Sequence, residues 1–143
     1  MSDLFVLAWI GDQQVAFDAT RVEAVVDIAM VVPVPLAAHH VLGLAAIRSQ
    51  VLTVIDCSAV VAGEPVAPTG RAIVTAIDGH KYALRVDRVE DVVTAVIRPG
   101  LTCHPLDRAW DAIANGIIET NDGFAVAVDP ARLVVSAPVA IAA

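Results

Sequence analysis

An internal repeat constrains the fold of this chain more than any other feature of its sequence. Residues 15–26 align with residues 82–93 without a gap, and an alanine, an arginine, a glutamate and three valines recur in register. Residues 43–61 align with residues 116–134, again without a gap and in the same order along the chain. Two blocks that recur in the same order indicate two related halves rather than a chance match.

The halves predict one domain over residues 1–143, with repeats at approximately 15–61 and 82–134 and a linker at 62–70. Glycines and prolines mark the linker, because they interrupt both helices and strands. Each half is too small to bury a good core alone. We therefore expect two similar β units, each with about five short strands, to pack on one another and share apolar surface.

Valine-rich runs favour strands throughout the chain, because branched side chains pack well on a pleated surface. Partly open barrels would hide the edges of strands this short. The sequence lacks the long amphipathic helices that a parallel α/β fold needs between its strands. We predict an all-β fold with one or two short helices, for which the candidate segments are 36–42, 57–61 and 107–114.

One tight turn differs between the halves. The first half turns through Arg48, Ser49 and Gln50, whereas the second turns through Asn121-Asp122-Gly123, whose residues tolerate positive φ. Small apolar and β-branched residues on either side predict a hairpin over residues 43–56. If the fold alone chose these residues, both turns could be Asn-Asp-Gly. We therefore interpret Arg48 as a residue retained for a contact; the alternative is a solvated turn arginine.

Few residues are arranged for catalysis or metal binding. No nucleophile elbow, phosphate loop or dinucleotide-binding glycine pattern is present. Asp56 and Asp129 occupy equivalent repeat positions, and each precedes an expected helical turn, where aspartate is a natural cap. The adjacent His39 and His40 would point to opposite faces of a strand, so they would not easily hold one ion. We expect no enzyme activity, no metal and no cofactor.

The charge of the chain limits its partners. The formal net charge is −7, and the nine lysines and arginines are scattered rather than gathered into a basic stripe. Nucleic acid is therefore not an expected partner. The N-terminus lacks a signal-peptide pattern, no apolar stretch is suited to span a bilayer, and the two cysteines make no disulfide framework. These features predict a cytoplasmic protein without direct membrane insertion.

Three stretches carry a family resemblance. They are the glycine-to-arginine hairpin with its closing Val-Ile-Asp at 43–56, the segment 83–92 with its Val-Asp-Arg-Val, and the segment 126–133. Together they resemble the CheW-like domain, the adaptor of bacterial chemotaxis arrays, over about Leu4 to Leu133. The resemblance implies two SH3-like five-stranded β-barrels packed together. It also implies a scaffold that bridges the regulatory domain of a CheA-type histidine kinase to the cytoplasmic tip of methyl-accepting chemoreceptors.

Partner-binding residues are implied by the same resemblance. Arg48 matches the family's arginine near the groove between the barrels where the receptor tip docks. Val22 and Val89 match apolar positions associated with receptor docking, and Ala83 matches a position usually occupied by glycine. Ala24 stands where family members often carry a glutamate that can pair with the arginine.

Two departures from the family pattern affect this site. Ser49 follows Arg48 where the family usually has glycine, and Glu23, beside Ala24, is expected to point to the opposite face of the strand. Either Arg48 meets a carboxylate on the receptor, or this adaptor has altered receptor choice. Two other functions stay open: a CheW-like module of another pathway, such as type IV pilus or second-messenger signalling, and a small-ligand-binding β-barrel.

Overall fold

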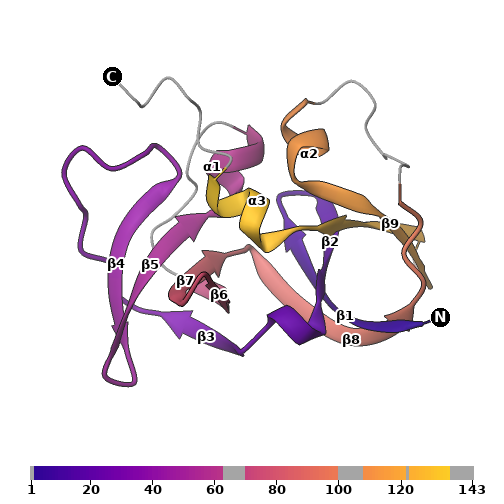
Figure 1. Cartoon of the computed structure of the whole chain (residues 1–143), viewed down its shortest axis with the longest axis horizontal. Coiled ribbons are helices and arrows are strands. Elements are labelled where there is room, and N and C mark those ends of the chain that lie inside the picture. The colour runs from indigo at the N-terminus through magenta and orange to yellow at the C-terminus, as the bar shows by residue number, and fades with distance from the viewer. Residues whose placement is uncertain (1, 63–69, 100–107, 122, 136–143) are drawn as a thin grey trace.

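The computed structural model describes residues 2–62, 70–99, 108–121 and 123–135, and these form two five-stranded sheets (Figure 1). Sheet A contains, in order across the sheet, β8 (Arg88–Ala95), β1 (Asp3–Ile10), β2 (Gln13–Asp18), β10 (Gly123–Val128) and β9 (Ala114–Thr120). Sheet B contains β3 (Ala24–Ile28), β6 (Gly70–Ile77), β7 (His80–Arg85), β5 (Gln50–Asp56) and β4 (Val41–Ile47). The short helices are η1 (Ala19–Arg21), α1 (Cys57–Ala62), α2 (Arg108–Ile113) and α3 (Pro130–Val135). The predicted all-β fold is confirmed.

Tight turns join β1 to β2, β6 to β7 and β4 to β5. β1 and β2 pair antiparallel around Gly11, and β6 and β7 pair around Asp78 and Gly79, all with positive φ. A two-residue turn of this kind matches the right-handed twist of the flanking strands, which is why Asp-Gly is frequent there. β4 and β5 form the hairpin predicted over 43–56, with Ile47 opposite Gln50.

The two sheets do not coincide with the two halves of the chain. β2, from the first half, pairs in parallel with β10 of the second half, with Ala16 opposite Ala127. β7, from the second half, pairs in parallel with β5 of the first half, with Ala83 opposite Val54. Each sheet therefore takes a hairpin from one half and three strands from the other. This corrects the expectation that each repeat forms a β unit of its own, while the repeat boundaries 15–61 and 82–134 stay a prediction.

Two glycines allow the sheets to close into barrels A and B. Val32, which follows β3, forms an isolated bridge with β4, and Arg98, which follows β8, forms one with β9. Gly43 has φ +145° and Gly116 has φ +146°. A Cβ added to Gly43 would stand 2.1 Å from the carbonyl oxygen of Val32, and one added to Gly116 would stand 2.3 Å from that of Arg98. Only glycine lets the backbones approach so closely. The bridges connect the two edges of each sheet.

The two sheets share one apolar core. Its large buried side chains come from both sheets and from the helices, and include Val6, Phe17, Ile55, Ile73, Leu84, Trp110, Ile113 and Leu133. Two smaller clusters fill the insides of the barrels, one from sheet B and one from sheet A. Because most of the large side chains lie in the shared core, each barrel depends on the other for its stability.

Helices are more numerous than predicted. The described residues form three α-helices of six residues each, instead of one or two. α1 and α2 lie at the predicted segments 57–61 and 107–114, but the segment 36–42 contains turns and the start of β4. Leu36 has φ 62°, which a right-handed helix does not accommodate. The predicted linker at 62–70 lies outside the described residues except at its two ends.

Aspartates cap the helices that follow β5 and β10. The backbone N–H of Ser58 donates to Asp56 Oδ1 at 2.9 Å, and that of Ala131 donates to Asp129 Oδ1 at 3.0 Å. Each carboxylate thus satisfies a backbone donor that the first turn of a helix leaves free. The interpretation of Asp56 and Asp129 as caps is confirmed.

Candidate partner-binding site

Arg48 and Ser49 form the turn of the β4–β5 hairpin, whose tip lies at the lower left of Figure 1. Their φ angles are 52° and 67°, so both residues adopt the left-handed conformation that asparagine and glycine adopt with least strain. Arg48 is exposed at this tip. The turn therefore holds an arginine where local conformation favours other residues.

All five strands of sheet B contribute to a pocket beside Arg48, which we call the Arg48 pocket. Its volume is about 190 Å³, and it is lined by Glu23, Ala24, Val26, Ile47, Arg48, Gln50, Leu52, Val74 and Lys81. The apolar members belong to the interior cluster of barrel B or pack against it. The polar members form the rim. The pocket is thus the mouth of barrel B, with an apolar floor and a charged rim.

The charged rim is only partly paired. Lys81 Nζ lies 3.0 Å from Glu23 Oε1, and both side chains are substantially exposed. Within the described parts of the chain, Arg48 makes no ion pair or side-chain hydrogen bond. Glu23 lines the same pocket as Ala24, which corrects the expectation that it points to the opposite face. Because β3 begins at Ala24, the alternation of a strand does not govern Glu23.

The other predicted site residues lie deeper. Val22 and Val89 are half-buried and pack against the core shared by the two sheets. Ala83 is fully buried in β7, where its neighbours across the sheet are Val54 and Val74. Ala83 therefore cannot touch a partner directly. The structure brings Arg48 and Ala24 together at the pocket, whereas Ala83 lies inside barrel B.

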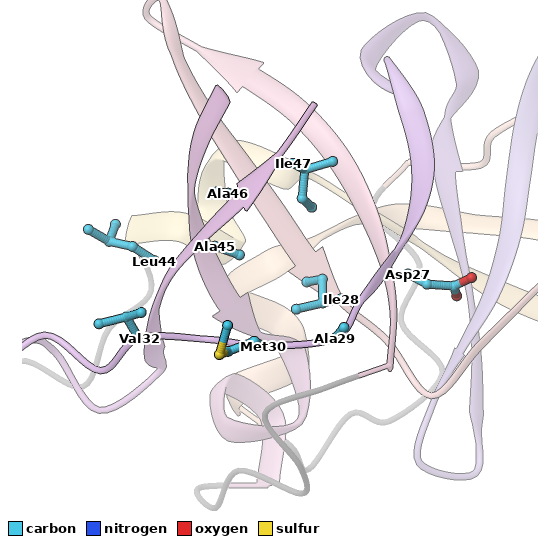
Figure 2. Close-up of a pocket in the computed structure, with 9 residues that line it drawn as sticks. All are labelled: Asp27, Ile28, Ala29, Met30, Val32, Leu44, Ala45, Ala46 and Ile47. Carbon is cyan, nitrogen blue, oxygen red and sulfur yellow. The ribbon is translucent and has the colours of Figure 1, made fainter. Parts of the chain in front are cut away.

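A second hollow lies between β4 and the segment that follows β3, and Figure 2 shows its lining. This apolar pocket has a volume of about 400 Å³ and is lined by Asp27, Ile28, Ala29, Met30, Val32, Leu44, Ala45, Ala46 and Ile47. Met30 is 74% exposed and Val32 60% exposed, so apolar side chains face solvent here. The sequence-based prediction did not include these residues. The signal was the apolar run 28–36, whose prolines prevent a buried strand.

An ion-pair cluster is centred on the buried side chain of Arg85. Arg85 Nη1 lies 3.6 Å from Asp56 Oδ1 and 3.4 Å from Asp87 Oδ1. Asp87 also accepts a hydrogen bond from the backbone N–H of Gly11, in the β1–β2 turn of sheet A. Arg85 is the last residue of β7 in sheet B, whereas Gly11 belongs to the β1–β2 turn of sheet A, so the cluster connects the two barrels. Asp87 is exposed and also has a structural role.

The candidates for catalysis and metal binding also have structural roles. His40 is buried, and its Nε2 donates to the carbonyl oxygen of Val134 at 2.6 Å, which ties the start of β4 to α3. Cys57 is buried in the shared core; burial, reinforced by the charge of Asp56, raises the pKa of its thiol far above the usual range. Among the described residues, no group of histidines, cysteines and carboxylates is arranged to hold a metal ion. The described part of the chain also contains no helix long and apolar enough to cross a membrane.

Comparison with known proteins relates this geometry to a family. A family model described as a CheW-like domain matches residues 4–137. The fold is similar to the crystal structure of the scaffolding protein TtCheW from Thermoanaerobacter tengcongensis, with a TM-score of 0.73, 23% sequence identity and 90% of each chain covered. At this identity the similarity shows the fold alone, and it confirms the two SH3-like barrels. No match was found among the curated proteins.

Proposed function

Because the chain belongs to the CheW-like domain family, we propose that it is a non-enzymatic adaptor that couples the cytoplasmic tips of chemoreceptors to a CheA-type histidine kinase. The family match over residues 4–137 carries this proposal. Two exposed hollows of barrel B, the apolar pocket and the Arg48 pocket, support it. The adaptor transmits the state of the receptor by contact, at receptor arrays in the cytoplasm.

The apolar pocket is suited to the kinase. Met30, Val32 and Leu44 form a contiguous exposed apolar surface, and such surfaces mark sites of protein association. The family resemblance implies that the regulatory domain of the kinase has the same barrel fold and pairs with the adaptor through barrel ends. We therefore assign the apolar pocket to the kinase's regulatory domain.

The receptor side is assigned to the residues singled out in the sequence. Arg48 and Ala24 line the pocket at the mouth of barrel B, and Val22 and Val89 lie half-buried at the shared core. Ala83 lies beneath this surface, opposite Val54 of β5 and Val74 of β6, so a larger side chain at this position would displace those strands. An exposed arginine in an otherwise paired rim is suited to orient a helix that carries acidic residues.

A pull-down with two baits tests the coupling role. The baits are a CheA-type kinase and a receptor signalling fragment from the same cell. Wild-type protein is expected to bind both. Arg48→Ala should weaken capture by the receptor fragment and leave the kinase arm unchanged, and Met30→Glu should do the reverse. A folded protein that binds neither bait would refute the proposal.

A CheW-like module of another pathway, such as type IV pilus or second-messenger signalling, is the second candidate. It is favoured by Ala24 and Ser49, which stand where the family often has glutamate and usually has glycine. These changes lie at the receptor side and would alter the choice of receptor. Binding to the kinase together with failure to bind chemotaxis receptors would support this candidate over the first.

A further inference from the structure

We propose that the Arg48 pocket binds one glutamate side chain of the receptor tip, and that Lys81 is a second cation of this site, released from Glu23 when the glutamate enters. The proposal rests on the proposed function, because it takes the receptor as the partner at this pocket. Neither the family match nor the sequence pattern assigns a role to Lys81 or Glu23.

The shape of the pocket favours a side chain with an apolar stem and a charged end. Ala24, Val26, Leu52 and Val74 form an apolar floor, and the charged residues lie at the rim. A glutamate that lies across the mouth can place its methylenes over this floor while its carboxylate meets the cations of the rim. An aliphatic side chain would cover the floor but leave the cations without an anion. An aspartate has a shorter stem and would cover less of the floor.

The charge of the pocket favours an anion. Arg48 and Lys81 carry two positive charges against the single carboxylate of Glu23, which leaves a formal charge of +1 at the pocket. The whole chain carries −7. The protein as a whole therefore repels an acidic partner, whereas the Arg48 pocket attracts it. This local positive charge favours an anionic ligand and directs it to the pocket.

The ion pair between Lys81 and Glu23 is built to exchange. The side chains of Lys81 and Glu23 are 37% and 41% exposed, so water screens their attraction and little is lost when the pair opens. Arg48 has no ion-pair partner among the described residues and is ready to bind first. Lys81 can then turn from Glu23 to the incoming carboxylate. Glu23 thus acts as an internal competitor that weakens binding.

Calorimetric titration of the full chain with the receptor signalling fragment tests these roles. Lys81→Met is expected to weaken binding about threefold to fivefold, and Glu23→Gln to strengthen it about twofold, in line with exposed ion pairs. Matched controls come from Arg71 and Asp27, which form an exposed ion pair of 3.1 Å outside the Arg48 pocket. Arg71→Met and Asp27→Asn remove the same charges and should change the affinity by less than about 1.5-fold.

A double-mutant cycle identifies the glutamate. Each glutamate of the receptor tip is changed to glutamine in turn and titrated against wild type and Arg48→Ala. One substitution should weaken binding to wild type about fivefold and have a clearly smaller effect on Arg48→Ala, in which only Lys81 is left to bind the carboxylate. Ala24→Glu supplies an internal carboxylate to Arg48 and should reduce the effect of that substitution.

The outcomes separate this proposal from the proposed function. If Arg48→Ala weakens receptor binding but Lys81→Met and Glu23→Gln match their controls, the adaptor role stands and the two-cation site is refuted. If no receptor glutamate couples to Arg48, the ligand assignment is refuted. If wild-type protein binds no receptor fragment, both the proposed function and the site fail together.

Discussion

The replacement Arg85→Met tests whether burial, rather than distance, decides the strength of an ion pair in this protein. Arg85 Nη1 lies 3.6 Å from Asp56 Oδ1, and the two side chains are 7% and 0% exposed. The pair between Arg71 and Asp27 is shorter, with 3.1 Å between Nε and Oδ1, but its side chains are 53% and 75% exposed. Distance alone would rank the Arg71 pair as the stronger one.

Burial reverses that order. Without Arg85 the buried carboxylate of Asp56 loses this guanidinium, and breaking a buried pair on one side costs about 3–5 kcal/mol. Arg71→Met removes an equal charge from a solvated pair and should cost no more than about 1 kcal/mol. Since folded domains are stable by about 5–15 kcal/mol in total, only Arg85→Met should remove a large share of the stability.

A second substitution isolates the charge. Asparagine at position 56 keeps an oxygen that can accept the Ser58 N–H but carries no negative charge. Adding Asp56→Asn to Arg85→Met should therefore recover about 1–3 kcal/mol, because a buried charge is replaced by a neutral group.

Urea unfolding followed by tryptophan fluorescence measures these effects, since Trp110 is buried in the shared core. The free energies of unfolding of wild type, Arg85→Met, Arg71→Met and the double variant are compared at pH 7. Equal losses for Arg85→Met and Arg71→Met would refute the reasoning. No recovery in the double variant would show that lost packing, rather than the buried charge, causes the loss.

Three further predictions concern single residues. Ser49→Gly should raise the free energy of unfolding by about 1 kcal/mol, because glycine adopts the left-handed φ of 67° without strain; a loss of stability in urea unfolding would contradict this. Gly43→Ala should lower the free energy of unfolding by about 3 kcal/mol, because the added Cβ would clash with the carbonyl of Val32. In the control Gly11→Ala the added Cβ meets no atom within 4 Å, so the loss should be only about 1 kcal/mol. Similar losses for the two variants would contradict the packing argument. In a Cys103→Ser background, Cys57 should resist iodoacetamide at pH 8 in the folded protein and react on unfolding, because its thiol is buried and its pKa is raised. Mass spectrometry detects the modified cysteine. Rapid modification in the absence of urea would contradict this prediction.

Much of the local structure follows from the sequence. The β4–β5 hairpin, the caps at Asp56 and Asp129 and the position of α1 were predicted, because strand propensity, turn residues and helix caps act between neighbours in the chain. The repeat likewise predicted two packed β units, although each barrel takes strands from both halves. The segment 36–42 was predicted wrongly as a helical turn, since the left-handed Leu36 and the prolines just before it, Pro33 and Pro35, favour an irregular path to β4.

The site was only partly predictable. The sequence singled out Arg48 because its turn differs from the equivalent turn of the other half, and it placed Ala24 near it. Strand alternation gave the wrong face for Glu23, because that residue precedes β3. Lys81 carried no signal at all, since it reaches the rim only through the position of β7 between β6 and β5.

The sequence by itself determined the all-β class and the turns, because each is encoded by residues close together in the chain, and the two-fold repeat can be read from the sequence directly. Only the tertiary structure decided that the halves exchange hairpins, that Arg85 pairs with the buried carboxylate of Asp56, and that Ala83 is buried. These features depend on parallel pairings between strands far apart in sequence, such as β2 with β10 and β5 with β7. No turn specifies a parallel pair, so its partners are chosen by the packing of the whole core.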